Sequence, residues 1–260
     1  MKNYVKQSKA RLIDLMLFFS FFQRNIGKKL VSKWLKKYTL AEKELIILPK
    51  ILKKDIIVFD IGANRGELSF FFAVICNFKK VFAFEPQSRM FGILQGIAEN
   101  IKNITPINIA LSDSIGEKTL KIPLRTTGRY TPAGSFEQLS EKNLEKEKVK
   151  VDTLDNFVIK NNITKIDFIK CDTEGHELAI LKGSQKTLTV FRPLLYVEIK
   201  NINKESLFNL LKNKKYHPYQ WNNTTSCLTM VTNRQNTQSE NYYFFPTEKR
   251  DQILKTLKYQ

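Results

Sequence analysis

Carboxylates end four short apolar runs of the sequence. Each run consists mainly of Val, Ile, Leu and Phe, a composition typical of a buried strand. In open α/β sheets ligands bind beyond the carboxyl ends of the strands, so acids at these positions can reach a bound ligand. A single acid in a turn is ordinary near the start of a helix, but four in equivalent places indicate a binding site. These acids are Asp60, Glu85, Asp172 and Glu198.

The turn after the first apolar run, residues 60–67, reads Asp-Ile-Gly-Ala-Asn-Arg-Gly-Glu. Gly62 and Gly66 allow a sharp turn and a close approach of the backbone to a ligand at the start of a helix. The dinucleotide fingerprint requires two further glycines, where this chain has Asn64 and a glutamate, so that fingerprint is absent. Glu85, about 20 residues further along, can accept hydrogen bonds from both ribose hydroxyls of an adenosine group. The pair favours an adenosine cofactor, of either the nicotinamide or the S-adenosylmethionine type.

Strands and helices alternate over residues 55–111 and again over residues 152–214. This alternation predicts a mostly parallel sheet with helices on both faces, the doubly wound α/β architecture. The predicted strands are residues 56–59, 81–84, 105–111, 166–170 and 194–197. The predicted helices are residues 67–76, 87–100, 177–188 and 203–214, with a further helix that begins near Asp152.

Residues 112–150 interrupt the alternation. They contain several prolines and glycines and then a charged stretch that ends at Lys150. Apart from a strand at residues 119–124, we expect loop here. Because an insertion of this length in a compact domain is usually functional, we interpret it as a candidate lid.

The C-terminal part contains two β-like runs, residues 227–231 and 242–245, joined by a polar turn. They predict an antiparallel hairpin at one edge of the sheet, followed by a short helix at residues 247–258. We therefore divide the chain into a basic helical N-terminal segment, residues 1–54, and one domain, residues 55–260.

Basic residues are concentrated in the N-terminal segment. The net charge of the chain is +18, and residues 1–54 contribute 14 Lys/Arg against three acids. A helical stripe of apolar residues runs from Leu12 to Trp34 with lysines between and after them. Two interpretations stay open: the helix docks on its own domain, or residues 1–38 lie on an anionic membrane surface. The apolar run at residues 12–22 is shorter than the roughly 20 residues that span a bilayer and has no cleavage site after it, so we expect neither a transmembrane helix nor a secretory signal.

The three cysteines, Cys76, Cys171 and Cys227, are widely spaced and odd in number. This pattern fits neither a disulfide framework nor a CxxC-type metal site, and it favours a reducing compartment. We therefore expect a cytoplasmic protein, peripheral at the inner face of the membrane if the second interpretation of the N-terminal segment holds.

The most specific part of the sequence is a series of short motifs in a fixed order. They are Val58–Gly66, Phe84–Pro86, Asn108–Asp113, Val151–Asp155, Asp167–Glu177, Leu181–Gly183 and Glu198–Ile199. In this order they resemble the FkbM family of S-adenosylmethionine-dependent methyltransferases over about residues 55–200, and the Asp-Thr-Glu-Gly-x-Glu block that starts at Asp172 is the most specific motif. Cys171 departs from the family pattern, in which Ile or Leu is more usual.

The resemblance implies a class I methyltransferase (Rossmann-like) sheet and S-adenosylmethionine as the methyl donor. It also implies O-methylation of a hydroxyl of a sugar, a glycan or another small molecule. Carried onto this chain, the glycine-rich turn lines the methionine part of the cofactor, the acid after the second strand holds the ribose, and residues 108–110 flank the adenine. The predicted cofactor-binding residues are Asp60, Gly62, Asn64, Gly66, Glu85, Asn108, Ala110 and Asp172.

The turn that leads into the helix at Glu177 carries the candidate catalytic residues Asp172, Glu174 and His176. Methyl transfer to a hydroxyl is an in-line displacement, so positioning supplies much of the rate and a base removes the proton. An imidazole suits such a base near neutral pH, and the alternative for His176 is a solvent-facing residue at the start of the helix. Asp172 and Glu174 are instead metal ligands if a divalent cation such as Mg²⁺ activates the hydroxyl, and helix capping is the alternative for Glu174.

Two other functions stay open on sequence grounds. The net charge fits an RNA methyltransferase, but no RNA-binding module is appended, and nucleic acid is not the partner that we expect. A non-catalytic membrane-surface scaffold on the same fold is the second. The intact set of strand-end acids Asp60, Glu85 and Asp172 argues against it.

Overall fold

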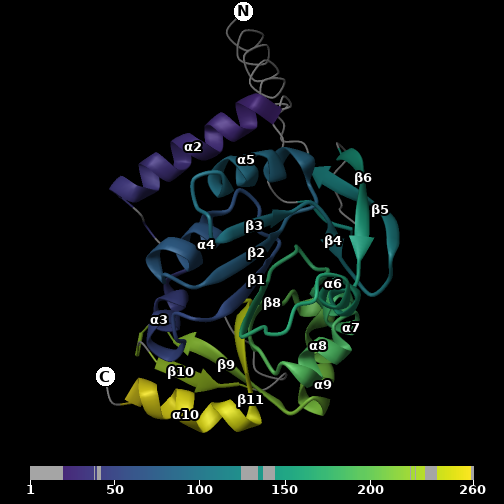
Figure 1. Cartoon of the computed structure of the whole chain (residues 1–260). Helices are drawn as coiled ribbons and strands as arrows, with labels where there is room; N and C mark the ends of the chain where they lie inside the picture. Colours follow the sequence, from purple (N-terminus) through teal and green to yellow (C-terminus); the bar gives the residue numbers. More distant parts are fainter. Residues whose placement is uncertain are drawn as a thin grey trace, which may run out of the picture.

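An eight-stranded sheet forms the centre of the molecule (Figure 1). The computed structural model describes residues 20–37, 39, 42–123, 134–136, 144–222, 224–225, 227–231 and 239–258. The strand order is β10-β9-β11-β8-β7-β1-β2-β3, and the five strands from β8 to β3 are parallel, as the alternation predicts. These five are β1 (Ile57–Ile61), β2 (Lys80–Phe84), β3 (Ile104–Ile107), β7 (Phe168–Cys171) and β8 (Leu194–Glu198).

The antiparallel edge of the sheet differs from the predicted hairpin. Strand β11 (Asn241–Pro246) lies between β8 and β9 (Tyr216–Asn222) and is antiparallel to both, while β10 (Cys227–Met230) pairs with β9. The two predicted strands exist but do not pair with each other, so the hairpin prediction is wrong. Strand β9 was not predicted because Pro218 and several polar residues obscure its alternation, although Tyr219 within it is buried.

Helices cover both faces of the sheet, and successive strand residues enter opposite cores. Val58 belongs to one apolar cluster and Phe59 to the other, as the two-residue period of a strand requires. The first core is covered by α2 (Ser20–Lys36), α3 (Leu48–Ile51), α4 (Glu67–Phe70), α5 (Ser88–Ala98) and α10 (Thr247–Lys258). The second is covered by α6 (Leu154–Lys160), α7 (Glu177–Lys182), α8 (Gln185–Val190) and α9 (Lys204–Asn213).

Several predicted helices have different limits in the structure. After α4 the chain continues as a π-helical turn, Phe71–Ile75, and the predicted helix at residues 177–188 is divided into α7 and α8. The helix expected near Asp152 begins at Leu154, where the Thr153 hydroxyl accepts a hydrogen bond from Asn156 N at 3.1 Å and caps its first turn.

A second, three-stranded sheet lies beside the main one, in the order β4-β6-β5 (Figure 1). Its strands are β4 (Ala110–Leu111), β5 (Gly116–Pro123) and β6 (Leu144–Asp152), and β5 and β6 pair antiparallel along their length. Strand β5 confirms the strand predicted at residues 119–124, whereas the prediction of loop is wrong for β6. The predicted third strand is also divided, because β3 belongs to the main sheet and β4 to the small one. Residues 124–133 and 137–143, on which much of the lid prediction falls, lie outside the described residues.

Helix α2 packs across α5 at glycines on both helices. A Cβ atom added to Gly27 would lie 2.2 Å from the Ile93 carbonyl oxygen, and one added to Gly96 would lie 2.1 Å from the Arg24 carbonyl oxygen. The ammonium of Lys28 also lies 2.9 Å from a carboxylate oxygen of Glu99 on the α5 side. The described part of the N-terminal segment therefore docks on its own domain, and residues 1–19 lie outside the described residues.

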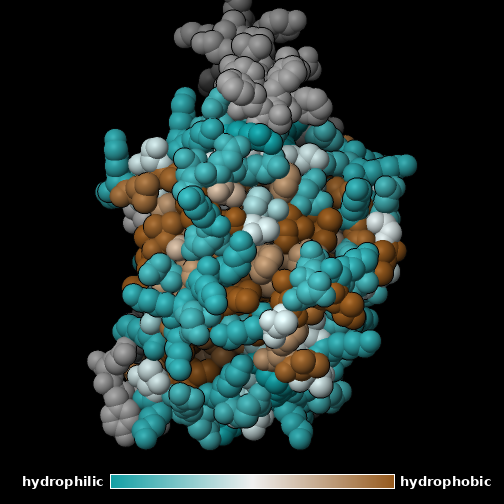
Figure 2. Space-filling view, in the orientation of Figure 1, coloured by the Kyte–Doolittle hydropathy of each residue, from teal (hydrophilic) through white to brown (hydrophobic). Residues whose placement is uncertain are grey.

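The surface is mostly hydrophilic on the face shown in Figure 2, where apolar side chains form several separate groups among polar ones. None of the helices within the described ranges is long and apolar enough to span a bilayer. All three cysteines are free: Cys76 and Cys171 are buried, and Cys227 is exposed.

Candidate active site

A pocket of about 220 Å³ opens beyond the carboxyl ends of β1, β2 and β7. The main sheet contributes the turns that follow these three strands, and the small sheet contributes Leu120 and the neighbouring residues Gly134 and Phe136. From the predicted site it gathers Gly62, Asn64, Glu85, Ala110, Asp172, Glu174 and His176.

The turn after β1 has the backbone conformation that its residues favour. Gly62 has φ 76° and Asn64 has φ 53°, both in the left-handed region that glycine and asparagine tolerate best. A Cβ atom on Gly62 would lie 1.9 Å from the Asp172 carbonyl oxygen, so glycine is required for the ends of β1 and β7 to approach. Gly66 also has a positive φ but faces Leu94 of α5 and does not line the pocket.

Glu85 connects the turns after β1 and β2. Its Oε2 accepts a hydrogen bond from Asn64 N at 2.7 Å, and its Oε1 accepts one from Gln87 N at 2.9 Å. The side chain is 6% exposed, and burial raises its pKa to about 7 in spite of these two donors. Asn108 stands behind this turn, where its amide donates to the carbonyl oxygens of Glu85 and Pro86 at 2.9 and 3.1 Å. Asn108 therefore holds the turn, whereas its neighbour Ala110 lines the pocket.

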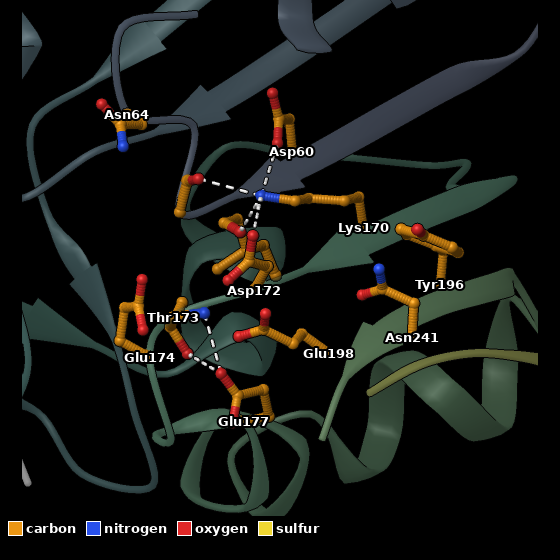
Figure 3. Close-up of polar contacts among 12 residues, drawn as sticks. Asp60, Asn64, Lys170, Asp172, Thr173, Glu174, Glu177, Tyr196, Glu198 and Asn241 are labelled. Atoms are coloured by element: carbon orange, nitrogen blue, oxygen red, sulfur yellow. Dashed lines mark hydrogen bonds and ion pairs between the residues drawn. The ribbon is translucent and has the colours of Figure 1, made fainter. Parts of the chain in front are cut away.

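Lys170 is the main residue of the site that the sequence analysis missed. It is 3% exposed, and its ammonium lies 3.6 Å from Asp60 Oδ1, 3.4 Å from Asp172 Oδ2 and 2.9 Å from the Gly62 carbonyl oxygen (Figure 3). Lys170 and Asp60 are partners in the register of β7 and β1. Burial opposes the charge of Lys170, but Asp172 and Asp60 outweigh it and raise the pKa of the lysine above its ordinary value. The feature that could have revealed it is a lysine within a predicted buried strand, two residues before the strand-end acid Asp172.

Asp60 does not line the pocket. Its side chain is fully buried, and its Oδ2 accepts a hydrogen bond from Ser69 Oγ at 2.6 Å. Burial raises the pKa of Asp60, and the charge of Lys170 opposes this shift. The structure therefore gives Asp60 a supporting position, in which it fixes Lys170.

Glu177 stabilises the turn that presents the candidate catalytic residues. Its Oε1 accepts hydrogen bonds from Thr173 N at 2.8 Å and Thr173 Oγ1 at 3.0 Å (Figure 3). It also accepts one from Gly175 N at 3.1 Å. These bonds hold a sharp turn in which Glu174 and Gly175 both have positive φ angles, 57° and 105°. The Glu174 carboxylate lines the pocket and lies 3.6 Å from the ammonium of Lys200.

His176 lies inside the molecule, so the solvent-facing alternative is wrong. It is 7% exposed, and its Nε2 lies 2.9 Å from Ser112 Oγ, which also accepts a hydrogen bond from Lys118 Nζ at 2.7 Å. Phe136 packs edge-on against the imidazole, with ring centroids 4.9 Å apart. The small sheet and the segment leading into it thus hold His176 at the pocket wall.

The carboxylates that could hold a cation differ from the expected pair. Asp172, Glu177 and Glu198 each bring one carboxylate oxygen within 4.8 Å of the others, whereas Glu174 is directed to Lys200. Burial and the nearby Asp172 raise the pKa of Glu198 to about 8, against the charge of Lys200 at 3.2 Å. This group is the one that fits a divalent cation among the described residues.

The fold and the site define a class I methyltransferase. Apart from β10, the strands β1, β2 and β3 lie on one side of the point where the strand order reverses, and β7 and β8 lie on the other side. The antiparallel strand β11 then lies between β8 and β9. The chain matches the family described as "Methyltransferase FkbM domain" over residues 60–218, which is more than half of its length. The chain therefore belongs to the FkbM methyltransferase family, as its motifs predict.

The chain is also similar to two known proteins. Hexuronic acid methyltransferase AglP from Haloferax volcanii is 29% identical over 154 residues, which cover 57% of this chain and 58% of that protein. The chain thus spans little more than half the length of this curated relative. The crystal structure of methyltransferase FkbM from Methylobacillus flagellatus matches with a TM-score of 0.50 at 17% identity, over 75% of this chain and 45% of that one. This second likeness shows the fold.

Proposed function

We propose that this chain transfers a methyl group from S-adenosylmethionine to a hydroxyl of a sugar, in a glycan or in a small molecule. The observation that carries the proposal is the buried Glu85 carboxylate beside the Gly62 turn, in a chain of the FkbM methyltransferase family. A carboxylate there can hold the two hydroxyls of a ribose, and the turn leaves backbone exposed to a ligand at the end of β1.

The residues present fit the cofactor at both ends of that turn. Glu85 already accepts two backbone hydrogen bonds, which fix its carboxylate, and each oxygen keeps a lone pair for a ribose hydroxyl. Gly62 and Asn64 face the same pocket, and Ile109 and Ala110 offer apolar surface for an adenine ring. When bound, S-adenosylmethionine supplies an electrophilic methyl group on its sulfonium.

The acceptor must lose its hydroxyl proton, and we assign its removal to His176. The imidazole is held by Ser112 and Phe136 at the wall of the pocket. A fixed base supports an in-line transfer because its geometry does not have to be organised during the reaction. Asp172 also lines the pocket, next to Gly62, where its negative charge favours the cationic donor.

A divalent cation is the alternative activator. Asp172, Glu177 and Glu198 offer three oxygen ligands of the kind that Mg²⁺ prefers. A cation bound there would lower the pKa of an acceptor hydroxyl and replace the base.

The sugar acceptor is supported by the relative whose name describes a hexuronic acid methyltransferase. Sugars offer hydroxyls, and uronic acids offer a carboxylate as well, so the bond formed is informative. Methylation of a hydroxyl gives an ether, and methylation of a carboxylate gives an ester.

The experiment is a transfer assay with S-adenosylmethionine labelled in the methyl group. Neutral hexoses, hexuronic acids, glycans that contain them and an RNA oligonucleotide serve as acceptors. We expect label in a sugar acceptor, and we expect it to survive mild alkali, which cleaves esters and leaves ethers. Alkali-labile label would replace the hydroxyl by a carboxylate as the acceptor group. Label in RNA alone would overturn the proposal.

A further inference from the structure

Glu42 lines the same pocket as Gly62 and Asp172, although it lies outside residues 60–218, which match the family. Among the described residues that line the pocket, it is the one that precedes β1. It directly precedes the short 3-10 helix Lys43–Ile47, in which Leu45 and Ile47 are buried. The basic N-terminal segment, residues 1–54, thus contributes a carboxylate to the candidate active site.

Hydrogen bonds hold this segment in place. Glu44 Oε1 accepts from the Tyr196 hydroxyl at 2.8 Å and from Asn241 Nδ2 at 3.1 Å, and the Tyr243 hydroxyl donates to the Glu44 carbonyl oxygen at 3.0 Å. The donors come from β8 and β11, and Figure 3 shows Tyr196 and Asn241 beside Lys170. Glu42, two residues before Glu44, is therefore presented by a fixed backbone.

Negative charge is in excess around Glu42. Lys170 is the cation that acts on its carboxylate, and the same lysine is shared by Asp60 and Asp172. Three carboxylates thus face one ammonium. Burial raises the pKa of Glu42 to about 7 although Lys170 opposes this shift. A ligand that brings a positive group to this place would relieve the excess charge.

The position of Glu42 indicates which part of the methyl donor its carboxylate can contact. Glu85 follows β2, on one side of β1, whereas Lys170 and Asp172 mark the end of β7 on the other side. A ligand with its ribose at Glu85 that passes over the Gly62 turn therefore has its opposite end near Glu42. In S-adenosylmethionine that end carries an α-ammonium group.

We propose that Glu42 binds the α-ammonium group of the methyl donor and closes the methionine end of the pocket from outside the family domain. This inference rests on the proposed function. It makes the segment before β1 part of the binding site as well as part of the scaffold.

Calorimetry on the full chain tests the inference with two ligands. S-adenosylhomocysteine carries the amino acid, and 5′-methylthioadenosine has the same adenosine and sulfur without it. Glu42→Gln keeps the shape of the side chain and removes its charge. We expect the affinity for S-adenosylhomocysteine to fall by roughly tenfold or more and the affinity for methylthioadenosine to stay within about twofold.

Glu205→Gln is the matched control, because it removes one charge from an exposed position at the start of α9; both affinities should stay unchanged. Glu42→Ala repeats the test if the glutamine variant does not fold. An equal loss for both ligands, or no loss for S-adenosylhomocysteine, would overturn the role of Glu42. If the wild-type chain binds neither ligand, the proposed function fails together with this inference. If it binds both and Glu42→Gln binds as wild type, only the role of Glu42 fails.

Discussion

At the scale of single residues, the buried ammonium of Lys170 joins the ends of β1 and β7. It ion-pairs with Asp60 and Asp172 and donates to the Gly62 carbonyl oxygen, so it fixes the floor and one wall of the pocket. A buried charge that has no partner of opposite charge destabilises the folded state. A change at Lys170 therefore affects two acids at once.

Lys170→Met should lower the free energy of unfolding by about 3–5 kcal/mol, because it leaves the buried Asp60 carboxylate and the partly buried Asp172 carboxylate without their cation. Urea denaturation measures the loss. Lys165→Met is the control: Lys165 pairs with Asp55 and Asp167 at 3.8 and 3.3 Å but is largely exposed, so the loss should be about 1 kcal/mol or less. Similar losses in the two variants would show that Lys170 is not the structural cation that its contacts indicate.

His176 is the second residue whose environment makes a specific prediction. If it is the general base, His176→Ala should reduce turnover by about 10²–10⁴ and leave donor affinity intact, because the imidazole acts on the acceptor. Turnover is measured on the sugar acceptor found in the transfer assay, with and without a chelator. The control is His217→Ala, which changes the other histidine, on β9 and hydrogen-bonded to Thr247.

The two mechanisms give opposite patterns in this assay. Loss of turnover with the chelator and normal turnover in His176→Ala would assign activation to a cation at Asp172, Glu177 and Glu198. Full turnover in His176→Ala with chelator present would mean that the turn at residues 172–177 only shapes the pocket.

At the scale of elements, the sequence predicts the parallel part of the fold well, because its central strands β1, β7 and β8 are buried on both faces. Apolar runs such as Val81–Phe84 and Leu194–Val197 end at their acids in the structure as predicted. The strands β6 and β9 were missed for the opposite reason. One face of β6 carries the exposed lysines Lys146, Lys148 and Lys150, and its buried face is short, so its composition is typical of a charged loop.

The site could be predicted only in part, for a similar reason. Motifs identify residues such as Gly62 and Glu85, whose role depends on the local turn and strand end. Contacts between segments that are far apart in the chain leave no local sequence pattern from which they could be predicted. Lys170 reaches Asp60 across a register set by the sheet, and Glu42 reaches the pocket because Glu44 is bound by β8 and β11.

The N-terminal helix makes a prediction at this scale. Deleting residues 1–38 should leave donor affinity nearly unchanged, since Glu42 is the first described residue that lines the pocket. The midpoint of thermal unfolding should fall, because α5 loses the helix that packs on Gly96. Retention on anionic vesicles should also fall, because the deleted part carries about half of the net positive charge of the chain. Equal retention of the full and truncated chains on vesicles would remove the membrane interpretation.

At the scale of the whole molecule, three parts of the chain meet at one pocket. The main sheet supplies the turns at Gly62, Glu85 and Asp172, the small sheet supplies the side that holds His176, and the segment before β1 supplies Glu42. The surface is strongly basic, whereas the interior of the site is acidic. This contrast suits a cationic donor inside the pocket, and it suits an anionic acceptor that is drawn toward the protein from outside.

The most direct test of this arrangement is the affinity of the full chain for S-adenosylhomocysteine, measured by calorimetry in wild type and in Glu85→Ala. We expect the wild type to bind, and the variant to lose about 1.5–3 kcal/mol of binding free energy with the loss of a charge-assisted ribose contact. Glu205→Ala, which removes an exposed carboxylate on α9, should bind as wild type does. Unchanged affinity in a folded Glu85→Ala protein, or no binding by the wild type, would contradict the placement of the cofactor at the ends of β1 and β2.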